Sequence, residues 1–255
     1  MTTKETLEGE AHATRREFAF GTVGGVAALF LAGCLDAEES DPAQQLDDGL
    51  ASEPIVEPEF EAEAGTCSVY PAQMEGPFYL DLDLLRSNIV DGKAGTPLQF
   101  VINVQRLSTC TPIANAAVDI WHADANGWYS GYARQGDGRN VDTRGQRFLR
   151  GTQVTDAAGR ATFDSIYPGW YRGRTTHVHI KVHLTSTTGF TSQMYFPDTI
   201  SSAVYRTGAY RARGQKDTSN AADRIARTGG ALPPLLAVTP SGSGYVATLT
   251  ITVRG

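Results

Sequence analysis

The chain has 255 residues, of which 41% are hydrophobic, and this length suits one medium-sized domain with extensions rather than two full domains. The net charge of −6 is unevenly distributed, because residues 67–255 carry nineteen Lys or Arg against thirteen Asp or Glu. No basic stretch is interleaved with aromatic residues, so nothing here indicates a nucleic-acid-binding protein.

The first 34 residues have the features of an export signal. Arg15 and Arg16 form a twin-arginine pattern, and the apolar run from Phe18 to Ala32 is too short and too glycine-rich to span a membrane. The run ends in Leu-Ala-Gly before Cys34, which resembles the lipobox of bacterial lipoproteins. We therefore expect an exported, membrane-anchored lipoprotein, periplasmic or at the cell surface, with Cys34 as the lipidation site. A plain signal peptide with an incidental cysteine is the alternative.

Residues 35–66 are predicted to be a disordered linker. They contain eleven Asp or Glu, no Lys or Arg, three prolines and few large apolar side chains. Such a segment cannot bury enough surface to offset the entropy of ordering. The folded domain is therefore expected to occupy residues 67–255.

Cys67 and Cys110 are the two cysteines of this domain. In an oxidising compartment the simplest use of such a pair is a disulfide between the start of the domain and an internal loop. Neither cysteine has a close Cys or His neighbour in the sequence, which disfavours a cysteine-based metal site.

The domain contains many short segments in which apolar residues alternate with polar ones, the pattern of half-buried strands. The segments 98–104, 117–121, 150–155, 160–163, 191–196 and 245–253 are predicted to be strands. The turn 156–159 is expected to join two of them as a hairpin, residues 130–146 read as a long loop, and 219–228 as the one helix. An all-β fold, a β-sandwich with long loops and one short helix, is predicted.

A further strand begins near His177. Val178 and every second residue after it are apolar, while His177, His179, Lys181 and His183 occupy the other face. Residues two apart on a strand lie about 6.6 Å apart on one face, and residues four apart lie about 13 Å apart. His177 and His179 are therefore the candidate pair of metal ligands, and His183 lies outside it.

Two tyrosines and an arginine accompany these histidines. Tyr171 follows a Pro-Gly turn and precedes His177 by six residues, with Arg174 between them, and Tyr129 follows an Asn-Gly turn at a strand end. A buried phenol and a buried guanidinium beside two imidazoles need a common partner. Phenol ionises at neutral pH only on a strongly Lewis-acidic ion, which favours ferric iron over zinc.

Four stretches carry a resemblance to a known family. They are Gly-Pro-Phe-Tyr at 76–79, Asp-Ile-Trp-His-Ala-Asp-Ala-Asn-Gly-Trp-Tyr-Ser at 119–130, Phe-Leu-Arg-Gly at 148–151, and Tyr-Pro-Gly-Trp-Tyr-Arg-Gly-Arg-Thr-Thr-His-Val-His at 167–179. From about Glu75 to Val253 the chain resembles the intradiol ring-cleavage dioxygenases, the group of catechol and protocatechuate dioxygenases, and most closely their exported single-domain relatives.

The resemblance implies a non-haem ferric ion, Fe(3+), held by Tyr129, Tyr171, His177 and His179. It further implies cleavage of a catechol-type aromatic by O2, with both oxygen atoms incorporated, to a cis,cis-muconate-type diacid. Tyr171 would leave the metal and take a substrate proton, Arg174 would stabilise negative charge on the ring, and Gln193 would be a second polar residue of the active site.

The chain departs from the family pattern at two places. Thr175 and Thr176 stand where many members have Pro-Ala, a change expected to loosen how Arg174 is held. Signal and linker replace the helical amino-terminal domain of catechol dioxygenases, so the oligomeric state stays open.

Two other functions are compatible with the residues. His122 could join His177 and His179 in a three-histidine zinc or ferrous site, with the tyrosines merely packed. Alternatively, the domain could be a cell-surface β-sandwich module that binds aromatic ligands without turnover.

Overall fold

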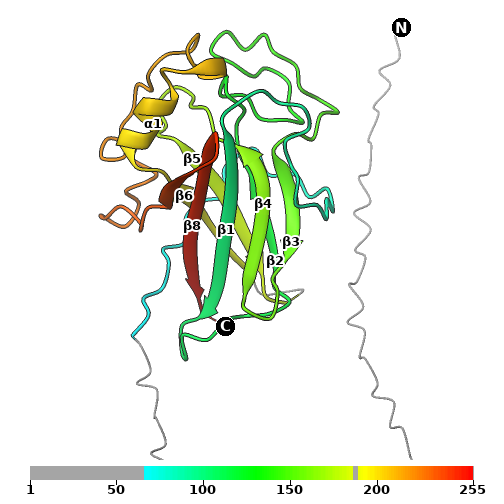
Figure 1. Ribbon diagram of the computed structural model, residues 1–255, viewed down its shortest axis with the longest axis vertical. Coiled ribbons are helices and arrows are strands. Elements are labelled where there is room, and N and C mark those ends of the chain that lie inside the picture. Colours follow the sequence, from blue (N-terminus) through cyan, green and yellow to red (C-terminus); the bar gives the residue numbers. More distant parts are fainter. Residues whose placement is uncertain (1–65, 186–188, 255) are drawn as a thin grey trace, which may run out of the picture. The chain divides into compact units, whose positions relative to one another are not determined.

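The described part of the chain forms two four-stranded β-sheets that pack face to face (Figure 1). The computed structural model describes residues 66–185 and 189–254; the predicted export signal with Cys34, and the predicted linker up to residue 65, lie outside the described residues. One sheet has the order β4 (Arg160–Ile166), β1 (Pro97–Arg106), β8 (Gly244–Val253), β7 (Ala237–Ser241). The other has the order β3 (Arg150–Val154), β2 (Ala117–Trp121), β5 (His177–His183), β6 (Gly189–Tyr195). The predicted all-β sandwich is confirmed.

Neighbouring strands are antiparallel except β1 and β8, which run parallel with Phe100 opposite Ala247. The inner faces of both sheets bury the apolar residues of the alternating pattern in one core, including Phe100 and Ile102 of β1 and Val178 and Ile180 of β5. Each such side chain contributes about 1.5–3 kcal/mol through burial. Because residues of a strand alternate between faces, packing Val178 and Ile180 inward directs the histidines of β5 to the opposite face of their sheet.

The predicted helix at 219–228 is wrong. This segment forms a series of turns, whereas the described helices are α1 (Asp198–Val204) and the 3-10 helix η1 (Gly208–Tyr210). Asp223 explains the difference, because its carboxylate accepts the backbone N–H groups of Ile225 and Ala226 and so competes with helical hydrogen bonding. No helix among the described residues is long and apolar enough to cross a membrane.

The turn at 156–159 forms, but the hairpin predicted around it is wrong. Asp156 accepts the N–H of Gly159 on its backbone oxygen and the N–H groups of Ala158 and Arg160 on its side chain. However, β3 pairs with β2 and β4 pairs with β1, so the turn carries the chain from one sheet to the other. Alternation shows which residues face the core; it does not reveal which strand is the hydrogen-bonding partner.

The other predicted strands are confirmed, with boundaries shifted by a few residues, and β7 is an additional strand. β7 lies at the edge of its sheet and contains Pro240, a residue that edge strands tolerate because one row of their N–H groups is unpaired.

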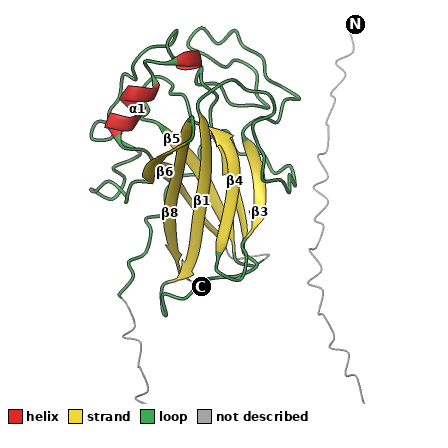
Figure 2. Ribbon diagram, in the orientation of Figure 1, coloured by secondary structure: helices red, strands yellow, loops and turns green. Residues whose placement is uncertain are grey.

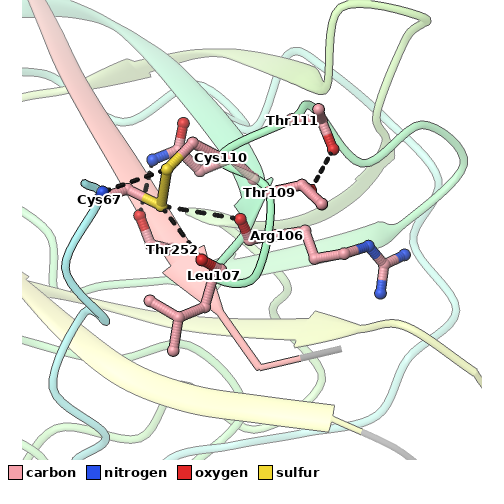
Figure 3. The surroundings of a disulfide bond; sticks show 8 residues. Cys67, Arg106, Leu107, Thr109, Cys110, Thr111 and Thr252 are labelled. Atoms are coloured by element: carbon pink, nitrogen blue, oxygen red, sulfur yellow. Dashed lines mark hydrogen bonds between the residues drawn. A yellow bond between two sulfur atoms is a disulfide. The ribbon is translucent and has the colours of Figure 1, made fainter. Parts of the chain in front are cut away.

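The predicted disulfide between Cys67 and Cys110 is present, with a Cα–Cα distance of 5.8 Å (Figure 3). It ties the start of the described chain to the turn after β1. A cross-link of this kind contributes about 2–4 kcal/mol to stability. At the other end of the sandwich, α1 and long loops gather beyond the strands (Figure 2).

Candidate metal centre

Four predicted donor atoms converge at the loop-bearing end of β5. The Tyr129 hydroxyl oxygen lies 3.2 Å from Nε2 of His177 and 3.0 Å from Nε2 of His179, and the Tyr171 hydroxyl oxygen lies 3.2 Å from Nε2 of His177. Two donors bound at right angles to one ion at about 2.0–2.1 Å are about 2.9 Å apart. The spacing of the four side chains therefore fits a single metal ion.

Contacts with neighbouring residues fix the orientation of the two histidine rings. Nδ1 of His177 donates to the Thr175 carbonyl oxygen (2.7 Å). Nε2 is therefore unprotonated, and its lone pair faces the tyrosines. The ring of His179 stacks on Trp121, its cross-strand partner on β2, with centroids 5.0 Å apart and planes inclined by 11°. A Cβ on Gly76 would lie 3.0 Å from Cε1 of His179, so only glycine lets this segment approach the ring so closely.

The tyrosines come from two loops that touch. Gly127, at φ +83° in the turn before Tyr129, lies so close to the Trp170 carbonyl oxygen that a Cβ there would be 2.1 Å from it. This contact brings the loop of Tyr129 against the loop of Tyr171. Phe78 then covers Tyr129, with ring centroids 4.4 Å apart and planes inclined by 18°.

The electrostatics of the site match a trivalent ion. Burial raises the pKa of both tyrosines above the ordinary value, although Arg174 opposes this, and burial lowers the pKa of His177 and His179 well below theirs. Without a metal the imidazoles are therefore neutral, which is the form that binds metals, and the phenols are protonated. Displacing two phenol protons requires a strongly Lewis-acidic ion, and two phenolates leave ferric iron with a single positive charge.

His122 does not belong to this cluster. Its Nδ1 donates to the Ala123 carbonyl oxygen (2.9 Å), and its Nε2 accepts from the Ser165 hydroxyl (2.8 Å), so both nitrogens are engaged. Across residues 66–185 and 189–254, no group of three His, Cys, Asp or Glu side chains could hold a metal ion. The three-histidine alternative is therefore wrong. His183 also lies apart, bonded to Asp119 (2.9 Å).

His122 should make stability depend on pH. Burial lowers its pKa to about 4 from the ordinary 6.5, so it contributes stability above pH 6.5 that is lost as pH falls towards 4. Between pH 7 and pH 4, we expect the protonation of His122 to lower the unfolding free energy by about 3 kcal/mol. Urea unfolding across this range should show a shallower pH slope for His122→Gln than for the wild type. Equal slopes would contradict a buried neutral His122.

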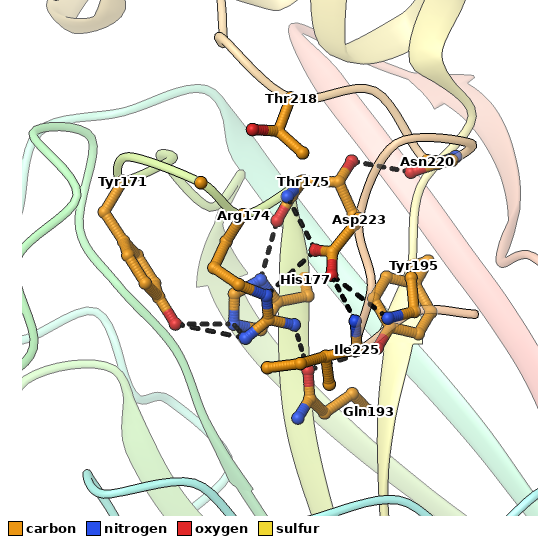
Figure 4. Close-up of polar contacts among 12 residues, drawn as sticks. Tyr171, Arg174, Thr175, His177, Gln193, Tyr195, Thr218, Asn220, Asp223 and Ile225 are labelled. Atoms are coloured by element: carbon orange, nitrogen blue, oxygen red, sulfur yellow. Dashed lines mark hydrogen bonds and ion pairs between the residues drawn. The ribbon is translucent and has the colours of Figure 1, made fainter. Parts of the chain in front are cut away.

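Arg174 lies between Gln193 and two of the donors, Tyr171 and His177 (Figure 4). Nη1 of Arg174 is 3.3 Å from the Tyr171 hydroxyl oxygen and 3.4 Å from Nε2 of His177, and Nη2 donates to Oε1 of Gln193 (2.5 Å). Gln193 stands on β6 directly opposite His179. All six residues predicted for the site are thus brought together by the fold.

Sequence reasoning missed two charged residues of the site's surroundings. Asp223 is the carboxylate partner of Arg174, at 2.9 Å, and it lies in the segment interpreted as a helix. Arg150, within one of the four recognised stretches, donates to the hydroxyl and carbonyl oxygens of Ser130 and to the Phe78 carbonyl oxygen. A buried arginine needs hydrogen-bond acceptors, and this requirement is the one signal that the sequence offers. No residue spacing in the sequence identifies which residues are those acceptors.

Comparison with known proteins agrees with this geometry. The family model described as dioxygenase matches residues 74–206. The structure is similar to an intradiol ring-cleavage dioxygenase from Tetranychus urticae, with 30% identity, a TM-score of 0.67, and coverage of 74% of this chain and 95% of that one.

Two further structures are similar. The dioxygenase domain of a dioxygenase carbohydrate-binding protein fusion from the cellulolytic bacterium Streptomyces sp. SirexAA-E has 28% identity and a TM-score of 0.52 over 73% of this chain and 99% of that one. 3-Chlorocatechol 1,2-dioxygenase from Rhodococcus opacus 1CP, at 22% identity and a TM-score of 0.50 over 71% of each chain, shares the fold. The matching family model and the 30% identical structure, together with the two tyrosines and two histidines at one point, show that the chain belongs to the intradiol ring-cleavage dioxygenase family.

Proposed function

We propose that this protein is a ferric iron-dependent dioxygenase that cleaves a catechol-type aromatic between its two hydroxylated carbons, converting it with O2 into a cis,cis-muconate-type diacid. The observation that carries the proposal is the convergence of two phenol oxygens and two imidazole nitrogens at 3.0–3.2 Å. Tyr129, Tyr171, His177 and His179 would hold the iron. When bound, the ion supplies the Lewis acidity that ionises the catechol and the redox chemistry that couples it to O2.

Tyr171 is the residue placed to take a substrate proton. Tyr129 is 1% exposed beneath Phe78, whereas Tyr171 is only partly buried and lies on a loop. Tyr171 would be one of the residues that hold the iron, and because burial raises the pKa of its hydroxyl, its phenolate would be a base strong enough to accept the proton of a catechol hydroxyl. Its Oη would then carry that proton beside Nη1 of Arg174.

Arg174 supplies positive charge next to the substrate. Its guanidinium is almost fully buried, so its field acts in a medium of low polarity and stabilises negative charge that develops on the ring and on oxygen. Gln193 accepts from Nη2 and limits rotation of the guanidinium. We assign Arg174 as the electrostatic catalyst and Gln193 as its orienting partner.

The test is oxygen uptake by the iron-loaded full chain with a panel of substituted catechols. We expect a burgundy tyrosinate-to-iron absorption band, and one O2 consumed for each muconate-type diacid formed. His183→Asn is the matched control, because it lies on the same face of β5 outside the donor set, and it should keep band and turnover. A colourless protein would contradict the ligand assignment, and colour without uptake of O2 would favour the aromatic-binding module.

We also propose that the chain is exported and anchored to a membrane through a lipid on Cys34. The twin-arginine pattern and the lipobox-like sequence support this, and the Cys67–Cys110 disulfide suits an oxidising compartment. Mass spectrometry of the membrane-extracted chain should find an acylated Cys34 as its first residue. A mature chain that lacks both lipid and Cys34 would contradict the anchor.

A further inference from the structure

We propose that Asp223 is a positioning residue of this active site, which holds the guanidinium of Arg174 so that one of its nitrogens faces Tyr171 and His177. The proposal rests on the function proposed above. Oδ2 of Asp223 accepts from Nε of Arg174 (2.9 Å) and from the backbone N–H of Thr175 (2.9 Å), as Figure 4 shows.

The Asp223 carboxylate is itself rigidly held. Its other oxygen, Oδ1, accepts from the backbone N–H of Ile225 (2.8 Å) and of Ala226 (3.1 Å), and the side chain is 1% exposed. Burial alone would raise the pKa of Asp223, but Arg174 and the backbone N–H groups of Thr175 and Ala226 outweigh it and hold the pKa below the ordinary value. A fully satisfied, ionised carboxylate is a fixed point against which Arg174 can be oriented.

Two contacts leave the arginine no freedom to rotate. Asp223 binds Nε and Gln193 binds Nη2, and these two nitrogens lie on one edge of the planar guanidinium. The remaining nitrogen, Nη1, therefore points to the Tyr171 hydroxyl (3.3 Å) and Nε2 of His177 (3.4 Å). Without Asp223, Gln193 would be the one partner left on that edge of the guanidinium, and a single hydrogen bond there permits rotation.

Thr175 adds a contact to this arrangement. Many members of the family were expected to have proline at this position. Proline lacks the N–H that Thr175 donates to Asp223. The Thr175 hydroxyl also donates to Oδ1 of Asn220 (2.6 Å), and Gln73 donates to the carbonyl oxygens of Ile225 and Ala226. The departure expected to loosen Arg174 instead ties it to the segment 220–226.

The test is Asp223→Asn, which keeps shape and one acceptor oxygen but removes the charge. Loss of a partner that orients a site residue costs about 10–100-fold in activity. We expect kcat to fall by about that factor, while KM and iron content change little; the melting temperature also falls, because Arg174 is left buried without its charged partner. Asp217→Asn is the matched control, because this exposed carboxylate accepts the Gly173 N–H of the same loop (3.1 Å), and it should leave kcat unchanged.

A second measurement needs neither iron nor turnover. In the metal-free wild type, 15N NMR should show a slowly exchanging Nε–H signal of Arg174, identified by its absence in Arg174→Lys and lost or fast-exchanging in Asp223→Asn. An unchanged kcat in Asp223→Asn, or a rapidly exchanging Nε–H in the wild type, would overturn the proposal. Loss of iron in step with kcat would also overturn it, in favour of a purely structural role. A wild type that consumes no O2 would instead reject the proposed function, while the NMR measurement still decides whether Asp223 fixes Arg174.

Discussion

Tyr171→Phe is expected to lower kcat by about 100-fold or more and to weaken and shift the tyrosinate-to-iron band. The variant keeps Tyr129, whose hydroxyl oxygen lies 3.2 Å from Nε2 of His177 and 3.0 Å from Nε2 of His179, so iron should still bind. It loses the hydroxyl that would receive the substrate proton under the proposed function and that lies 3.3 Å from Nη1 of Arg174. Stopped-flow absorbance and oxygen uptake with the best catechol of the panel provide the measurement.

Tyr245→Phe is the control for this experiment. Tyr245 lies on β8 and packs its ring on Tyr167, with centroids 6.2 Å apart, away from the four donors. Its band and rate should match the wild type. An unchanged band and rate in Tyr171→Phe would show that Tyr171 is neither a ligand nor a proton acceptor.

Arg150→Met is expected to lower the unfolding free energy by about 3 kcal/mol or more, because it leaves three buried oxygen acceptors without their donor, at about 1–3 kcal/mol each. Arg150 is 3% exposed, and burial lowers its pKa to about 10, so it is charged at neutral pH. It donates to the hydroxyl and carbonyl oxygens of Ser130 and to the Phe78 carbonyl oxygen (2.7–2.8 Å), and methionine leaves all three without this donor. Urea unfolding of the metal-free protein measures the loss.

The same variant should bind iron more weakly. Ser130 follows Tyr129 directly, and Phe78 stacks on the Tyr129 ring, so Arg150 holds both neighbours of this ligand. Arg144→Met is the control, because Arg144 pairs with Asp142 in solvent and its loss should leave unfolding unchanged. Equal stability of Arg150→Met and Arg144→Met would contradict the network.

Local features of the site were readable from the sequence because they depend on neighbouring residues. Period-two alternation placed His177 and His179 on the face of β5 that points away from the core, and the Asn-Gly turn placed Tyr129 just beyond a strand. The resemblance supplied the grouping of these residues with Tyr171, Arg174 and Gln193. The structure then brought all of them together.

Long-range pairing was decided by tertiary structure alone. Alternation does not reveal that β3 and β4 belong to different sheets, although only five residues separate them in the sequence. α1 has seven residues and no side-chain cap, so it forms because Ser201 and Val204 are buried against the sandwich, a contact that no local propensity reveals. Asp223 and Arg174 are 49 residues apart, and their ion pair exists because desolvating Arg174 alone would cost more than folding 219–228 as turns around a carboxylate. The sequence by itself therefore determined the side chains proposed as donors and every strand except β7. Tertiary structure decided how the strands pair and, because buried charges need partners, which residue holds Arg174 in place.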